Sequence, residues 1–262
     1  MRSIPLSFRE AVLEARALVQ ELRIESPDEI DIELIASHCG TLVRFDSLTH
    51  EDGQLIAAGD SGIIVVNEGA RDSNRWRFVV AHELGHFRRH KKLDQLALCT
   101  DPDLHHWYAT SGHEPEANHF AAELLMPEHL FKKRCDRNKP SLHDIRDLAR
   151  TFAASLTATA LRFVDYCPEP VAVVFSAGGA IKWWSRSDDF RFWLKKGHPL
   201  GKLTYAGDLF SGKQVDDRPS AVSAEGWCDD ANAADATDAE VQEHSVRLGT
   251  YGVLTLLWHP YE

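Results

Sequence analysis

The segment His82-Glu83-Leu84-Gly85-His86 constrains the fold and chemistry of this chain more than any other. The apolar run 78–81 precedes it and predicts a buried helix. Residues four apart share one helical face, so His82 and His86 can both reach one metal ion. Glu83 is then placed to take a proton from the water that zinc activates. The alternative is a helix with two partly buried histidines.

A catalytic zinc site needs a third protein ligand and an open position, whereas structural zinc takes four closed ligands. The metzincin continuation of the motif is excluded, because Arg89 and Lys92 occupy its glycine and third-histidine positions. The other common solution is a glutamate on a second helix. Residues 114–127 predict such a helix, with a proline near each end.

Two glutamates of that segment compete for the ligand position. The helical stripe of Glu114 also contains Ala117, Asn118, Ala121 and Leu125, and it is expected to pack on the H-E-x-x-H helix. Glu116 shares its side with His119 and Glu123, which is typical of a solvated face. We therefore predict Glu114 as the third ligand and Asn118 as a residue that orients a ligand. The alternative is that Glu114 only caps its helix.

The runs RFVVAHELGHFRRH and EPEANHFAAELLMP resemble, at this spacing, the ImmA/IrrE family of metallo-endopeptidases. The resemblance covers residues 30–165 and implies a gluzincin-like fold. Carried over by position, the zinc ligands are His82, His86 and Glu114, with Mn²⁺ as a substitute ion. Glu83 is the catalytic base. The resemblance also implies an intracellular bacterial or phage enzyme that cleaves a helix-turn-helix transcriptional repressor in a stress or mobile-element response.

Composition agrees with a cytoplasmic enzyme. The chain has 262 residues, of which 44% are apolar and 26% charged, and this length predicts one or two domains. No apolar run approaches the roughly 18 residues of a membrane span, and the first residues do not resemble a secretory signal. The five cysteines form no C-x-x-C pair, as is typical of reduced thiols. Two of them, Cys39 and Cys167, are expected in the core.

Net charge argues against some partners. The chain carries a net charge of −11, so we expect neither direct nucleic-acid binding nor a membrane partner. The sequence does not indicate which oligomeric state the protein adopts. Residues 215–243 hold nine acids and one base, which predicts a mobile acidic loop. Residues 71–92 hold seven bases and two acids. We interpret them as a solvated positive face of the metal helix, with a substrate-docking surface as the alternative.

The predicted fold is α+β, in three parts. Residues 1–135 form the gluzincin-like metallopeptidase domain, with two helices, a small antiparallel sheet, the metal helix and the glutamate helix. The strand at 62–67 is expected either to bind an extended peptide along its edge or to pack inside the sheet. Residues 136–166 form a helical subdomain that resembles a helix-turn-helix. Its second helix begins without basic or amide side chains, so a structural role is predicted.

Residues 167–262 are predicted to form a C-terminal α+β domain. A hairpin is expected around Gly178-Gly179 and a helix at 188–196. By analogy with family relatives, this domain resembles a GAF-like sensor; the alternative is a scaffold that covers the cleft or binds substrate. Candidates for stabilising the oxyanion are Tyr108, His113, His198, Tyr205 and His244. The rival functional hypothesis is a non-catalytic metal-binding regulator that acts by protein–protein interaction, and the intact Glu83 favours the enzyme.

Overall fold

The computed structural model describes residues 8–49, 51–89, 97–100, 113–135, 139–228 and 239–259, with only the backbone at 97–100. The chain divides into two compact units. The N-terminal unit consists of Ser3–Phe131 and Ala149–Ser155, and the C-terminal unit of Met1–Arg2, Lys132–Leu148 and Leu156–Glu262. Each mixes helices with a small sheet, so the predicted α+β class is confirmed. The three-part division of the chain stays a prediction.

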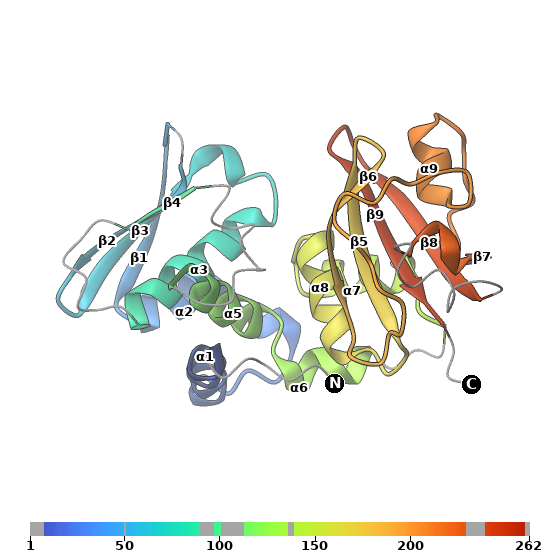
Figure 1. Ribbon diagram of the computed structural model, residues 1–262. Helices are drawn as coiled ribbons and strands as arrows, with labels where there is room; N and C mark the ends of the chain where they lie inside the picture. The colour runs from blue at the N-terminus through green and yellow to red at the C-terminus, as the bar shows by residue number, and fades with distance from the viewer. Residues whose placement is uncertain are drawn as a thin grey trace. The chain divides into compact units, whose positions relative to one another are not determined.

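The N-terminal unit contains a four-stranded sheet and five described α-helices. The strands are β1 (Thr41–Asp46), β2 (Glu51–Ala58), β3 (Ser61–Asn67) and β4 (Ala97–Thr100). The helices are α1 (Arg9–Glu21), α2 (Ile32–His38), α3 (Arg75–Arg89), α5 (His113–Leu125) and α6 (Glu128–Phe131). Short 3-10 turns lie at Pro27–Glu29 and Glu68–Ala70. Helix α3 packs against β2 and β3, and also against α2 and α5, while α1 packs on α5 (Figure 1).

The strand order of this sheet is β1-β3-β2-β4. The pair β1–β3 is parallel, while β2–β3 and β2–β4 are antiparallel. The prediction that this sheet is antiparallel is therefore wrong for the β1–β3 pair. Strand β2 folds back on β3, and β3 lies parallel to β1 on its other side. The predicted peptide-binding edge at 62–67 is also wrong. Strand β3 has a hydrogen-bonded neighbour on each side, so its alternative, packing inside the sheet, holds.

Local sequence signals explain how several of these elements begin. Asp31 precedes α2, and its carboxylate accepts hydrogen bonds from the N–H groups of Glu33 and Leu34, both at 3.1 Å. Before α3, the Ser73 hydroxyl accepts a 3.4 Å hydrogen bond from the Arg75 N–H. These contacts satisfy N–H groups that have no partner within the helix.

The C-terminal unit is built on a five-stranded antiparallel sheet of order β6-β5-β9-β8-β7. The strands are β5 (Val171–Ala177), β6 (Ala180–Arg186), β7 (Ser220–Ser223), β8 (Glu240–Leu248) and β9 (Gly252–Trp258). The helices are α7 (Leu142–Thr151), whose last three residues belong to the other unit, α8 (Leu156–Tyr166) and α9 (Tyr205–Phe210). Further 3-10 turns lie at Lys132–Arg134 and Ala224–Gly226. Helix α8 packs on β5 and β6.

The predicted turns of this unit are present. Gly178 and Gly179 close the β5–β6 hairpin with φ angles of +59° and +72°, the left-handed pair that a tight hairpin turn needs. Helices α7 and α8 are separated by a turn in which Ala153 has a φ of +47°. The helix-turn-helix and GAF-like likenesses stay predictions.

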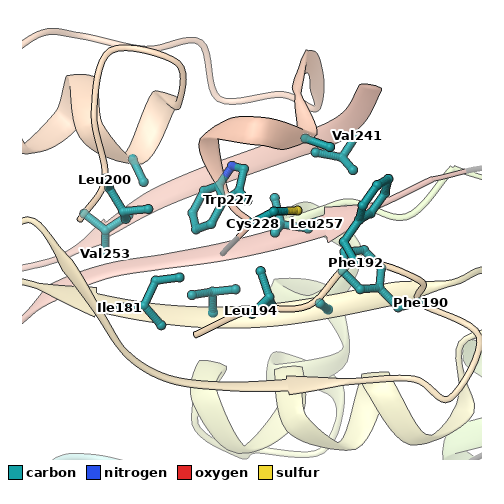
Figure 2. Close-up of a cluster of buried hydrophobic side chains, with 14 of the residues drawn as sticks. Ile181, Phe190, Phe192, Leu194, Leu200, Trp227, Cys228, Val241, Val253 and Leu257 are labelled. Carbon is teal, nitrogen blue, oxygen red and sulfur yellow. The ribbon is translucent and has the colours of Figure 1, made fainter. Parts of the chain in front are cut away.

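The predicted helix at 188–196 is wrong, because this segment is irregular and contains no helix. Phe190, Phe192 and Leu194 are buried, while the intervening Trp193 is 47% exposed. Alternate residues therefore point into the core, which is the period of extended chain rather than of a helix. Figure 2 shows these three buried side chains in one cluster with Trp227, Cys228, Val253 and Leu257.

Two further expectations are corrected. The segment 215–243 is not one acidic loop, because β7, a 3-10 turn and the start of β8 lie within it; residues 229–238 are outside the described part. Cys39 and Cys167 are only partly buried, whereas Cys135 and Cys228 lie in the core as free thiols. Among the described helices, none combines the length and apolar character that crossing a membrane requires.

Candidate metal centre

Helix α3 carries the two motif histidines and Glu83 into the interior of the N-terminal unit. His82 and Glu83 are fully buried, and His86 is 6% exposed. Gly85 explains how a second helix comes so close. A Cβ at this position would lie 3.2 Å from the Ala117 Cα on α5. The glycine of the motif therefore allows α5 to pack directly on α3.

This close packing brings Glu114 beside both histidines. Its carboxylate oxygens lie 3.1 Å from His82 Nε2 and 3.3 Å from His86 Nε2. The two Nε2 atoms are 3.0 Å apart. Three electron-pair donors thus converge, all within 4.8 Å of one another. Two ring nitrogens and a carboxylate at these separations are suited to surround a cation.

Asn118 orients one of these histidines from the other side of its ring. Its Oδ1 lies 2.9 Å from His82 Nδ1, and both residues are fully buried. An amide oxygen only accepts hydrogen bonds, so Nδ1 carries the proton. The neutral ring then presents the lone pair of Nε2 toward Glu114 and His86. This is the ring orientation that a metal-ligating histidine needs.

The electrostatics of Glu114 suit a ligand. Burial raises the pKa of this carboxyl group, but the neighbouring side chains of His82 and His86 outweigh burial and hold the pKa well below its usual range. The carboxylate is therefore ionised at neutral pH. Its side chain remains 35% exposed, so solvent reaches the trio from the Glu114 side. A site with three donors and an open side has the form of a catalytic rather than a structural metal centre.

Glu83 lies close to the sheet of this unit. A Cβ added to Gly53 of β2 would lie 3.1 Å from Glu83 Oε1. Sequence reasoning placed Glu83 beside the histidines but missed Gly53. The sequence marks it only as a glycine that separates two predicted strands, whereas the structure places it inside β2, where a glycine is typical of a bulge or of close backbone approach. A bulge is present between Glu51 and Gly53.

The expected solvated face of α5 is wrong. Glu123 is 1% exposed and accepts a hydrogen bond from Arg16 on α1 at 3.1 Å. Glu116 lies 3.2 Å from Arg89, and the His119 ring stacks on Phe8. These polar side chains lie against neighbouring parts of the unit, which supply partner charges and an aromatic ring.

The arginines of α3 correct the expected positive outer face in the same way. Arg88 donates to Glu14 at 3.0 Å, and Arg75 to Asp52 at 2.6 Å. Arg89 pairs with Glu10 and Glu14 as well as with the α5 carboxylate. In the described residues these bases bind carboxylates of their own unit. Lys91 and Lys92 of the same segment lie outside the described residues, so the docking alternative stays a prediction.

The oxyanion candidates divide among the parts of the chain. His113 is the exposed first residue of α5, next to Glu114. His198, Tyr205 and His244 belong to the C-terminal unit. Tyr108 lies outside the described residues. No role for any of the five follows from these positions.

A second group of two histidines and a carboxylate, which sequence reasoning missed, lies in the C-terminal unit. It comprises His143, Asp217 and His244. Here the Leu142 N–H donates to His244 Nδ1 at 3.0 Å, and His244 Nε2 lies 2.9 Å from Asp217 Oδ1. No short spacing along the chain links the three residues, so sequence alone offered no signal.

Two helices that bring two histidines and a glutamate together beside a small mixed sheet define a metallopeptidase domain. Residues 36–164 match the model of the Peptidase_M78 family, described as the IrrE N-terminal-like domain. Residues 36–164, which contain both motifs, are thus a domain of the ImmA/IrrE type, and this match confirms the resemblance in the motifs.

One relative in that family is the radiation response metalloprotease IrrE of Deinococcus radiodurans. It is 28% identical over 150 residues, a stretch that covers 56% of this chain and 43% of the relative. The match thus spans less than half of that protein. A solved structure, a Mycobacterium tuberculosis transcriptional regulator, aligns with a TM-score of 0.54 at 16% identity, over 95% of this chain and 75% of that one. This likeness concerns the fold alone.

Proposed function

We propose that this protein is a zinc-dependent endopeptidase. The observation that carries the proposal is the convergence of His82, His86 and Glu114, with Asn118 holding the proton of His82 on the far side of the ring. The match to a metallopeptidase family supports it. The proposed ligands are those three side chains.

The donor set fits zinc. Zinc takes imidazole nitrogen and carboxylate oxygen in tetrahedral geometry, and bond lengths of about 2.0–2.1 Å imply ligand atoms about 3.3 Å apart. The separations here are 3.0–3.3 Å. Two nitrogens are a poor match for Ca²⁺ or Mg²⁺, which prefer oxygen. Mn²⁺ is a substitute that the same donors accept.

The chemistry divides between the ion and the protein. Bound zinc would polarise the scissile carbonyl and make the attacking water more acidic. Glu83 accepts the proton of that water and passes it to the leaving amine. Asn118 keeps His82 in the required tautomer. Glu83 can serve as the base because it follows His82 directly and is shielded from bulk solvent.

The peptide is proposed to bind along β4. This strand is the outer one of the described sheet on the β2 side, and its Cys99 is paired with Gly53, where an added Cβ would lie 3.1 Å from Glu83 Oε1. An extended substrate that adds to the outer edge of β4 would lie two strand spacings, ~9.6 Å, from the backbone of Gly53. Strand addition satisfies backbone groups of both partners and tolerates many side chains.

We further propose that the substrate is a helix-turn-helix transcriptional repressor in the cytoplasm, cleaved at one site during a stress or mobile-element response. The family match supports this, as does the radiation response for which the Deinococcus relative is named. An enzyme inside the cell must be restricted to few partners, since an unrestricted peptidase would degrade other cellular proteins.

The test compares wild type with Glu83→Gln, using a candidate repressor as substrate. The variant should keep its zinc and its melting temperature, because glutamine has the same shape, and cleavage should fall by about 10²–10⁴-fold. Glu116→Gln is the matched control and should cleave normally. Undiminished cleavage by Glu83→Gln would remove the base assignment. If wild type and Glu83→Gln control transcription equally well, the rival hypothesis of a non-catalytic regulator is supported.

A further inference from the structure

Gly53 lies on β2, close to Glu83 on α3. A Cβ built on Gly53 would overlap Cγ1 of Val79 and would lie 3.1 Å from Glu83 Oε1 and 3.5 Å from its Cγ. Val79 and Glu83 are one turn apart on α3, and both are fully buried. The backbone of the strand therefore forms one wall of the space that holds the Glu83 carboxylate.

Strand β2 cannot easily move away from this helix. It is hydrogen-bonded to β3 on one side and β4 on the other. Its first residues are also held in place: the Asp52 carboxylate pairs with Arg75 at the start of α3, and the Glu51 carbonyl accepts a 2.9 Å hydrogen bond from Asn67. An atom added at position 53 must therefore be accommodated by the side chains on α3.

We propose that Gly53 is a positioning residue for Glu83: the missing side chain lets the β2 backbone hold the carboxylate in its working orientation. The inference rests on the proposed function of Glu83 as the base. The φ angle of Gly53 lies outside the left-handed region, so alanine fits the backbone and only the contacts with α3 change.

Gly62 provides a matched control. It lies on β3 and also faces α3, and a Cβ there would meet the Phe87 ring and the carbonyl oxygen of Ile56, each at 3.2 Å. Phe87 follows Glu83 by one helical turn. Gly62→Ala thus crowds the same interface between sheet and helix but contacts a side chain with no proposed part in hydrolysis.

The experiment measures zinc per chain, melting temperature, and kcat and KM for one peptide chosen from a quenched fluorogenic library with wild type. Gly53→Ala should keep zinc and KM, while kcat falls roughly 10–100-fold, as expected for a misplaced catalytic group. Gly62→Ala should lose thermal stability but keep kcat.

A second variant separates an effect on the position of the Glu83 carboxylate from an effect on the thermal stability of the protein. In Gly53→Ala/Val79→Ala the overlap with Val79 is gone, so the melting temperature should return to that of Val79→Ala alone. The 3.1 Å approach to Glu83 remains, so kcat should stay low. If kcat recovers together with the melting temperature, Gly53 acts only through packing and the inference is overturned.

Crystal structures of wild type and Gly53→Ala complete the test. We expect the Glu83 carboxylate to be displaced in the variant, and an unchanged carboxylate would overturn the inference whatever the kinetics. If wild type with zinc hydrolyses neither peptide nor repressor, the proposed function fails instead. Active wild type together with fully active Gly53→Ala would reject only the role of Gly53.

Discussion

Each unit of this protein gathers two histidines and one carboxylate within 4.8 Å, yet the two groups differ in what they can bind. In the N-terminal unit, Nδ1 of His82 faces an amide oxygen of Asn118 and so carries the ring proton. In the C-terminal unit, Nδ1 of His244 accepts from the Leu142 N–H. The neutral ring of His244 must then carry its proton on Nε2, where it donates to Asp217.

The hydrogen-bond partner of one ring nitrogen thus decides, as much as the neighbouring donors do, what the other nitrogen of a histidine can bind. A lone pair on Nε2 is available to a metal only if the other nitrogen holds the proton. His82 meets this condition, whereas His244 would have to lose its proton or its backbone hydrogen bond. The second group is therefore a hydrogen-bonded cluster that ties the segment around Asp217 to α7 and β8.

The largest expected effect is on metal content. His82→Ala should lose the bound zinc and all measurable hydrolysis, because two donors hold the ion poorly. His244→Ala should leave the zinc content unchanged. Elemental analysis of both purified variants after dialysis against zinc gives the answer. If wild type binds two zinc ions per chain and His244→Ala loses one of them, the proton on Nε2 does not keep His244 from binding metal.

The next effect concerns the partner of His82. Asn118→Ala removes the acceptor on Nδ1, and we expect zinc affinity to fall by about 10–100-fold. Asn118→Asp keeps an acceptor and should retain zinc. Competition with a chromophoric chelator measures both affinities. Equal zinc affinity in wild type and Asn118→Ala would mean that packing of α5 on α3 alone orients His82.

A third prediction uses the pH dependence of the C-terminal cluster. Burial lowers the pKa of His244 from its ordinary value of 6.5, against the opposing effect of Asp217. The unfolded chain therefore takes up a proton near pH 6.5 while the folded chain does not. The contribution of neutral His244 to the free energy of unfolding is complete above pH 6.5. It is lost as the pH falls from there through the pKa of His244 in the folded state.

Asp217 acts in the same direction at lower pH. The hydrogen bond from His244 and the nearby Arg146 lower its pKa, so its contribution is lost only under more acidic conditions. Urea unfolding of metal-free protein between pH 7.5 and 5.5 should show the decline for wild type. His244→Gln should be less stable at pH 7.5 and show a shallower decline. Parallel curves for the two proteins would assign the pH dependence elsewhere.

The two clusters also show what sequence can and cannot predict. The first was found because His82 and His86 are one helical turn apart and Glu114 lies on a stripe of small residues. The second joins residues from α7, the segment before β7, and β8, so only the tertiary fold brings them together. The faces of α3 and α5 were misjudged for a similar reason. Charged residues usually mark solvent, but Glu123 and Arg89 meet partners from α1 that no local pattern predicts.

Most strand positions were predictable from apolar alternation and from glycine turns, but β4 and β7 were not, and neither were the strand neighbours. Nothing in the alternation of β3 indicates that it lies between β1 and β2. The segment with Phe190 and Phe192 was assigned to a helix because its period-2 pattern is short and interrupted by Trp193. Contact between Gly53 and Glu83 likewise depends on which strand packs against α3.

The smallest expected effect tests the phase of α5. Glu116 is two residues from Glu114 but points toward Arg89, which also pairs with Glu10 and Glu14. In Glu116→Ala, Arg89 keeps those two partners, so we expect zinc to stay bound and stability to fall by only about 0.5–1 kcal/mol. Glu114→Ala should instead lose zinc, with its charge-stabilised contacts to both histidines removed. Zinc analysis and chemical unfolding of the two variants side by side provide the measurement. If Glu116→Ala loses zinc while Glu114→Ala retains it, α5 presents a different face to α3, and the metal centre of the N-terminal unit has a different third ligand.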